Sequence, residues 1–150
     1  MADRRYLKAS EAERFVQVYL ESLGYLVHRA RRSGGQREIP FGEVTRRMWF
    51  TESHDLFGCL DLLALSREAE RSVWGVQVST MAGSPVRRRK LERVAWPEVM
   101  AISLARVEIQ RDPANARRDV RWICFQDLYG AEWRPWRKVE TVWELWHKRC

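Results

Sequence analysis

Apolar residues recur at intervals of three and four near the start of the chain, which is the spacing of one face of an α-helix. The positions are Phe15, Val16, Tyr19, Leu20 and Leu23. Ser10 and Glu13 have the spacing of a capping box at the start of such a helix, and Gly24 is a typical residue at its end. The pattern therefore predicts a helix that begins at Ser10 and ends before Gly24.

Three short apolar runs after this helix predict strands: residues 25–30 (YLVHRA), 59–65 (CLDLLAL) and 73–80 (VWGVQVST). Only a polar turn separates the last two runs, so we expect them to pair as a hairpin. Residues 31–40 are basic and contain two glycines, which is typical of a loop. Residues 41–54 fit either a strand or an ordered loop.

The second half of the chain returns to a helical pattern. Ser84 and Pro85 are a favourable cap and first position for a helix, and the pattern continues to residue 105 with a kink at Pro97. Two further strands, residues 107–110 and 120–125, are predicted on either side of a turn.

The order of these elements mixes strands with helices and predicts an α/β fold, in which a central mixed β-sheet is flanked by helices. A last helix is predicted for residues 142–149, in a tryptophan-rich tail. Because the 150 residues contain neither an internal repeat nor a clear linker, we expect a single domain over residues 1–150.

The chain is basic, with a net charge of +7, and only four of its 27 lysine and arginine residues are lysines. A basic, arginine-rich chain favours an anionic partner, with nucleic acid first and a membrane surface second. GC-rich codon usage or thermal adaptation would account for the arginines equally well. No stretch is apolar enough to span a membrane, so we expect no membrane partner.

The cysteines and histidines set the expected compartment. Three widely spaced cysteines form no CxxC motif, and no zinc-binding spacing joins them to the three histidines. The first residues do not resemble a signal peptide. We therefore expect a reduced, cytoplasmic protein.

The predicted hairpin carries the polar residues that most suggest a site. Asp61 interrupts the first apolar run, and Gln77 and Ser79 share one face of the second because side chains alternate along a strand. The hairpin brings Asp61 near these two residues, and Glu13 of the first helix could approach the same point. The opposite face of the second strand is expected in the core: Trp74, Val76 and Val78.

Each of these polar residues also has a structural interpretation. Glu13 fits the capping box, and Gln77 and Ser79 fit ordinary polar positions of a sheet. Asp61 could be a hydrogen-bonded structural aspartate. It is the hardest to dismiss, because a buried carboxylate without a partner or metal is costly.

Residues 10–35 (SEAERFVQVYLESLGYLVHRARRSGG) resemble the opening of the archaeal-type Holliday junction resolvases, members of the PD-(D/E)XK nuclease superfamily. These enzymes begin with a Glu-Arg helix, a glycine stop, a strand ending in arginine and a Gly/Ser loop. An Asp on one strand and an E-x-K motif on the next then form the metal site. The resemblance covers roughly the first two-thirds of the chain, with one long insertion between Ser33 and Asp61. It implies a restriction-endonuclease-like core.

The resemblance implies roles for individual residues. Glu13 matches a carboxylate that binds metal or water, and Asp61 matches the metal-bridging aspartate. Arg14 and Arg29 match the two arginines of the family pattern, and Ser33 matches the loop serine.

The E-x-K motif, however, reads Gln77-Val78-Ser79 in this chain. Gln77 retains an oxygen that Mg²⁺ accepts but lacks the charge of a carboxylate, and Ser79 cannot replace an ammonium group. Lys90 could supply a positive group from the second helix, as relocated lysines do in some members of the superfamily, and Arg87, Arg88 and Arg89 are weaker candidates for the same role. Residues 55–65 and 74–80 are also similar to a phage and bacterial subgroup with Q-x-S or Q-x-T, which implies that Asp55 supplies the missing carboxylate.

Residues near these positions are candidates for phosphate contacts, although a basic helix face is most often merely solvated. The DNA-binding candidates are Arg14, Arg29, Arg31, Arg32, Ser33, Arg87, Arg88, Arg89 and Arg93.

These observations lead to three hypotheses. The first is an Mg²⁺- or Mn²⁺-dependent endonuclease that resolves four-way DNA junctions in recombination and repair; the resemblance implies a homodimer in a prokaryotic or phage-infected cell. The second is a nuclease-fold protein that binds DNA but cuts it slowly or not at all. The third is an interaction protein that uses the fold as a scaffold. Only the first two require salt-dependent DNA binding.

Overall fold

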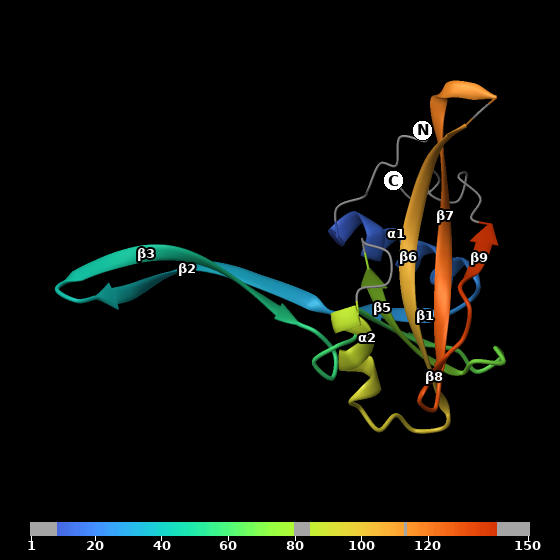
Figure 1. Ribbon diagram of the computed structural model, residues 1–150, viewed down its shortest axis with the longest axis horizontal. Coiled ribbons are helices and arrows are strands. Elements are labelled where there is room, and N and C mark those ends of the chain that lie inside the picture. The colour runs from blue at the N-terminus through green and yellow to red at the C-terminus, as the bar shows by residue number, and fades with distance from the viewer. Residues whose placement is uncertain (1–8, 80–84, 113, 141–150) are drawn as a thin grey trace.

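The computed structural model describes residues 9–79, 85–112 and 114–140 (Figure 1). Within these ranges the elements are α1 (Ala9–Ser22), β1 (Leu26–Arg29), β2 (Arg31–Phe41), β3 (Val44–His54), β4 (Leu62–Leu65), β5 (Val73–Ser79), α2 (Pro85–Glu92), β6 (Met100–Asp112), β7 (Asn115–Tyr129), β8 (Glu132–Trp133) and β9 (Arg137–Glu140). The cap predicted at Ser84 and the helix predicted for residues 142–149 lie outside the described residues.

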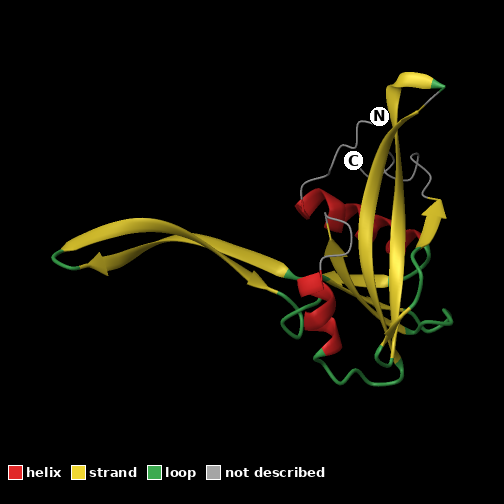
Figure 2. Cartoon of the chain, viewed as in Figure 1, coloured by secondary structure: helices red, strands yellow, loops and turns green. Residues whose placement is uncertain are grey.

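A mixed seven-stranded sheet forms the body of the molecule (Figure 2). Its order is β1-β4-β5-β6-β7-β8, and β9 also pairs with β7. β5 and β6 are parallel and are connected through α2, whereas the other neighbours are antiparallel. The predicted α/β fold with a mixed sheet is confirmed, and so is the hairpin expected from residues 59–65 and 73–80.

The two helices pack on opposite faces of the sheet. The apolar stripe of α1 joins the residues of β5 that were predicted to face the core, Trp74, Val76 and Val78. A second cluster contains Leu91 of α2. It lies on the other face, because a Cβ at Gly75, between Trp74 and Val76, would meet side chains of this second cluster.

A buried polar network fastens β7 to the rest of the sheet. Asp127 accepts hydrogen bonds from Arg71 (2.9 and 3.1 Å), from Arg137 (3.0 Å) and from the hydroxyl of Ser103 (2.5 Å). The indole of Trp74 donates to the same hydroxyl at 2.8 Å. Burial raises the pKa of Asp127, but the hydrogen bonds from Arg71, Arg137 and Ser103 outweigh it and lower the pKa to about 2.

β2 and β3 form a two-stranded ribbon, called the arm below, which extends away from the sheet (Figure 1). The prediction of a loop for residues 31–40 is therefore wrong, because these residues belong to β2. The strands pair residue by residue from Arg31 opposite His54 to Phe41 opposite Val44, so the ladder satisfies the backbone despite the two glycines. A two-residue turn closes the ribbon, with Gly42 at φ +66°.

The prediction that the second helix continues to residue 105 is also wrong beyond Glu92. α2 ends at Glu92, and β6 begins at Met100. The indole of Trp96 donates to the carbonyl of Leu91 at 2.8 Å and so satisfies one acceptor at the end of the helix. Residues 100–105 instead belong to a central strand with both faces covered, which explains their continuous apolar pattern. No helix in the described ranges is long and apolar enough to cross a membrane.

Candidate functional site

The candidate site lies where β5 extends beyond β4. β4 begins at Leu62, opposite Val76, so the last three residues of β5 have no partner in β4. Side chains take the place of the missing strand at Val78. The Val78 amide donates to Oδ2 of Asp61 at 2.8 Å, and the guanidinium of Arg87 donates to the Val78 carbonyl. Two oppositely charged side chains are thereby fixed at one sheet edge.

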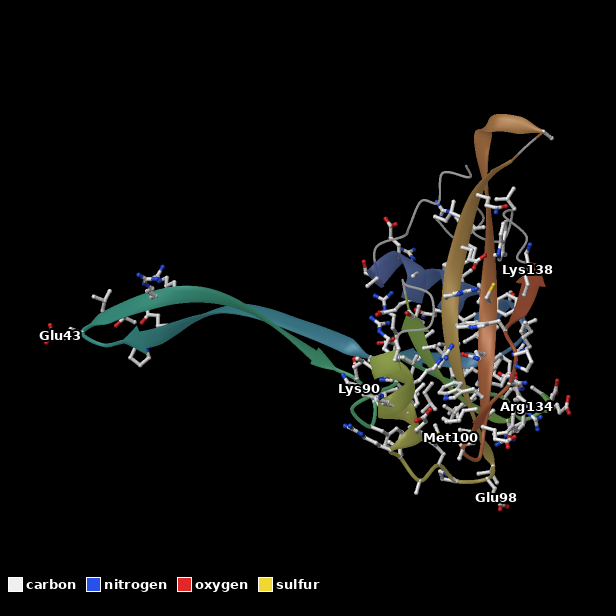
Figure 3. The ribbon with its side chains drawn as sticks, in the orientation of Figure 1. Glu43, Lys90, Glu98, Met100, Arg134 and Lys138 are labelled. Atoms are coloured by element: carbon white, nitrogen blue, oxygen red, sulfur yellow. The ribbon has the colours of Figure 1, made fainter. Side chains whose placement is uncertain are left out.

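A small cleft of about 180 Å³ opens at this point. Its walls come from the start of α1, the segment after the arm, the residue before β4, the end of β5, and α2. The lining residues are Ala9, Glu13, Asp55, Asp61, Gln77, Val78, Arg87 and Lys90. Separate parts of the sequence thus bring all the carboxylates proposed from the sequence together with one lysine and one arginine. Figure 3 shows Lys90 on α2 near the base of the arm, whose far end carries Glu43.

Asp61 is an ionisable group of the cleft whose pKa is strongly shifted. Its side chain is buried, with only 5% of the residue exposed. Burial raises the pKa of Asp61 to about 7, and the nearby carboxylates of Glu13 and Asp55 add to this increase. The hydrogen bond from Val78 and the charge of Arg87 act in the opposite direction. The carboxyl group therefore changes its charge near neutral pH.

Gln77 also lines the cleft. The residue is 8% exposed, and its Oε1 accepts no hydrogen bond from any residue that the structure describes. A buried carbonyl oxygen without a donor is costly, so the position favours a ligand that an oxygen can bind. Hard divalent cations such as Mg²⁺ prefer oxygen ligands, carboxylate and amide alike.

The oxygen donors in the lining of the cleft are of the kinds that can hold a divalent cation. Across residues 9–79, 85–112 and 114–140, no three His, Cys, Asp or Glu side chains are arranged to hold a metal ion. The donors would be the carboxylates of Glu13 and Asp61 together with the Gln77 amide, with Asp55 at the rim. Such a set matches Mg²⁺, which retains several waters and uses few protein carboxylates.

The two residues proposed to replace the family lysine differ in position. Ser79 is buried, with 1% of the residue exposed, and it is not among the residues that line the cleft. Lys90 lines the cleft from α2. The ammonium group found in the lining of the cleft, among the residues that the structure describes, therefore comes from the helix and not from β5.

The structural interpretation of Glu13 as a capping residue does not hold. α1 already includes Ala9, so Ser10 lies inside the helix and not at its cap, and the predicted start was wrong. Glu13 is instead 5% exposed and lines the cleft.

The DNA-binding candidates have different environments. Arg14 and Arg29, like Arg89 and Arg93, are exposed. Arg88 packs its guanidinium 5.9 Å from the ring centroid of Trp133 and does not line the cleft. Three further candidates form the start of β2, at the base of the arm: Arg31, Arg32 and Ser33.

Arg87 is the site residue whose role the sequence did not reveal. It was a candidate for phosphate contacts, whereas the structure also binds it to the β5 backbone. The available signal is its spacing from Lys90, because residues three apart on a helix share a face.

Comparisons with known proteins identify no relative, since no protein family, curated protein or solved structure matches the chain.

Proposed function

We propose that this protein is a metal-dependent endonuclease that acts on DNA, built on a restriction-endonuclease-like core of the PD-(D/E)XK type. The observation that carries the proposal is the convergence of Asp61, Gln77 and Glu13 with Lys90 in one cleft. Hydrolysis of a phosphodiester requires oxygen ligands for a cation and positive charge near the phosphate, and this cleft contains both.

The residues of the cleft divide into two roles. Glu13, Asp61 and Gln77 would hold Mg²⁺ or Mn²⁺, and Asp55 would support them from the rim. When bound, the cation supplies charge stabilisation at the phosphorus and lowers the pKa of water. Lys90 would bind the phosphate on the side facing α2, and Arg87 would keep Asp61 and the end of β5 in position.

The DNA substrate is supported by charge. The chain has a net charge of +7, and α1, β1 and α2 carry exposed arginines. Phosphate contacts by such residues supply affinity without sequence preference. A preference for four-way junctions and action as a homodimer rest on the resemblance of residues 10–35 to the resolvases.

A second candidate function is DNA binding without cleavage. It is favoured by the neutral Gln77 at the position of a carboxylate and by the location of Ser79 outside the cleft. Loss of one negative ligand weakens metal binding, and the fold would then act as a DNA-binding module.

The test uses a labelled four-way junction and a linear duplex of matched sequence, each with Mg²⁺, Mn²⁺ or EDTA. Asp61→Asn removes the charge with little change in shape, and Glu68→Gln, an exposed residue between β4 and β5, is the matched control. Metal-dependent cleavage that Asp61→Asn abolishes and Glu68→Gln retains would support the nuclease. Salt-sensitive binding without cleavage would support the second candidate, and no salt-sensitive DNA binding would reject both.

A further inference from the structure

An exposed aromatic residue with an unusual backbone conformation lies two residues after Asp55, which lines the cleft. Phe57 lies in the turn between the arm and β4, is 67% exposed, and has a φ of +54°. A left-handed backbone is uncommon for residues other than glycine and rarest for bulky ones. Such outliers concentrate at functional sites. Exposure and conformation are therefore both unfavourable for this residue in the folded chain.

The turn that presents Phe57 is held firmly on both sides. The amide of Gly58 donates to the carbonyl of Asp55 at 3.1 Å, and the amide of Leu56 donates to the carbonyl of Leu60 at 2.8 Å. Leu56 and Leu60 belong to the apolar cluster beneath α2. Phe57 thus projects from an anchored turn.

A second aromatic ring stands beside Phe57. The ring of Trp96 lies edge-to-face with it, with centroids 5.9 Å apart and an interplanar angle of 88°. The hydrogen bond from the Trp96 indole to the Leu91 carbonyl fixes this second ring to the end of α2. Phe57 is the more exposed of the two, so one face of an aromatic pair remains open to solvent.

Each of the two chain segments that carry the aromatic pair also carries a residue of the cleft. Asp55, two residues before Phe57, lines the cleft. Lys90, next to the residue whose carbonyl accepts from Trp96, lines the cleft from α2, and the exposed Arg93 follows directly after this helix. Two cations suited to phosphates therefore lie within a few residues of Trp96 in the sequence.

We propose that Phe57 is a stacking site for an unpaired nucleobase of branched or forked DNA. The inference rests on the proposed function, since it places the base beside a cleft that acts on the adjoining phosphodiester. Every base has a π face, so an aromatic ring in a cationic setting binds single-stranded nucleotides without sequence preference. In an intact duplex the bases are stacked on each other, and Phe57 finds no partner.

A purely structural role for Phe57 makes the opposite prediction about stability. If the ring mainly packs against Trp96, Phe57→Gly should lower the melting temperature. If it is retained for binding, Phe57→Gly relieves the left-handed strain and leaves the melting temperature unchanged or higher.

The experiment measures the affinity of the full chain for two DNAs in EDTA: a fork with 2-aminopurine at its unpaired branch position, and a linear duplex of the same sequence. The variants are Phe57→Gly and Phe57→Leu. The control is Tyr129→Leu, which alters an exposed aromatic residue at the end of β7, outside the cleft. In the unaltered protein, stacking on Phe57 should quench the fluorescence of the 2-aminopurine base. We expect both Phe57 variants to bind the fork about tenfold more weakly, to lose this quenching, and to keep the affinity for the duplex.

The inference would be overturned by unchanged fork affinity and quenching in both Phe57 variants, or by an equal loss of affinity for fork and duplex. If the unaltered protein binds neither DNA, the proposed function fails together with the inference. If it binds both DNAs and Tyr129→Leu weakens the fork as much as Phe57→Leu does, only the inference fails.

Discussion

Asp61 and Arg87 bind the two main-chain groups of a single residue, Val78, at the edge of β5 that β4 leaves unpaired. A carboxylate and a guanidinium thus complete a β-sheet ladder and, at the same time, line the cleft. The arrangement has a consequence for stability, because Asp61 must be buried near other carboxylates in order to reach Val78. The energetic cost of that burial is measurable.

We expect Asp61→Asn to stabilise the protein at alkaline pH in the presence of EDTA. Burial raises the pKa of Asp61 to about 7 from the ordinary value of 3.8. The folded state therefore binds more protons than the unfolded state between about pH 4 and pH 7, and its stability falls as the pH rises through this window. At pH 8 the variant should be more stable by about 4 kcal/mol, as measured by urea denaturation.

The same denaturation series provides its own control. Below about pH 3 both proteins carry a mostly neutral group at this position in the folded and the unfolded state, so their free energies of unfolding should agree. A constant difference between Asp61→Asn and the unaltered protein from pH 4 to pH 8 would contradict the raised pKa.

Replacing Arg87 should shift the ionisation of Asp61. Arg87→Gln removes a positive charge that lowers the pKa of Asp61 in the folded protein. The upper end of the pH range over which stability falls should therefore move upward. The variant should also lose about 1–2 kcal/mol, because the Val78 carbonyl loses a charged donor. Arg89→Gln, an exposed arginine of the same helix, is the matched control and should leave both quantities unchanged. Equal behaviour of the two variants would contradict the role given to Arg87.

Gln77→Glu should destabilise the metal-free protein and increase its affinity for a divalent cation. A third buried carboxylate near Asp61 and Glu13 destabilises the metal-free form through repulsion and desolvation, and it adds a charged ligand for a cation. We expect a lower melting temperature in EDTA and about tenfold tighter Mn²⁺ binding, measured by calorimetry at pH 8.

Gln126→Glu is the matched control for this experiment. Gln126 is also buried and its Oε1 also lacks a hydrogen bond within the described chain, but it does not line the cleft. Mn²⁺ should restore the melting temperature of Gln77→Glu and leave that of Gln126→Glu unchanged. An equal increase in the melting temperatures of both variants with Mn²⁺ would contradict the assignment of Gln77 as a metal ligand.

Asp127 should show the opposite dependence on pH from Asp61. Its pKa is lowered to about 2, so its stabilising contribution is complete above about pH 4 and is lost as the pH falls toward 2. Asp127→Asn leaves Arg71 and Arg137 without their buried carboxylate and should cost about 3 kcal/mol at pH 7. Urea denaturation should show a smaller difference in the free energy of unfolding between Asp127→Asn and the unaltered protein at pH 3 than at pH 7. The same difference at both pH values would contradict the ion pairs of Asp127 with Arg71 and Arg137.

The sequence predicted the parts of this molecule that are local or that lie on neighbouring strands. The helix ending before Gly24 and the β4–β5 hairpin follow from apolar spacing and turn residues, and the hairpin alone places Asp61 near Gln77. The first strand of the arm was missed because its glycines and charges are typical of a loop, and only pairing across the arm makes it extended.

Other parts depend on the tertiary structure. Residues 100–105 were assigned to a helix because a strand covered on both faces lacks the alternation that distinguishes it from a buried helix. Lys90 reaches the cleft only because α2 crosses beside the unpaired edge of β5, which no spacing in the sequence encodes. The raised pKa of Asp61 likewise reflects burial among segments that are distant in the sequence.

The arm also affects how molecules of this protein meet one another. Among the described strands, β2 and β3 pair only with each other, so each has an edge of unpaired amides and carbonyls along the ribbon. Such edges are templates for intermolecular β-pairing, which charged residues and proline oppose. Pro40 lies on one edge strand, and Glu38 and Arg47 form an exposed ion pair across the ribbon. Charge and proline thus oppose the pairing of two arms along these edges, and salt that screens the charges weakens this opposition.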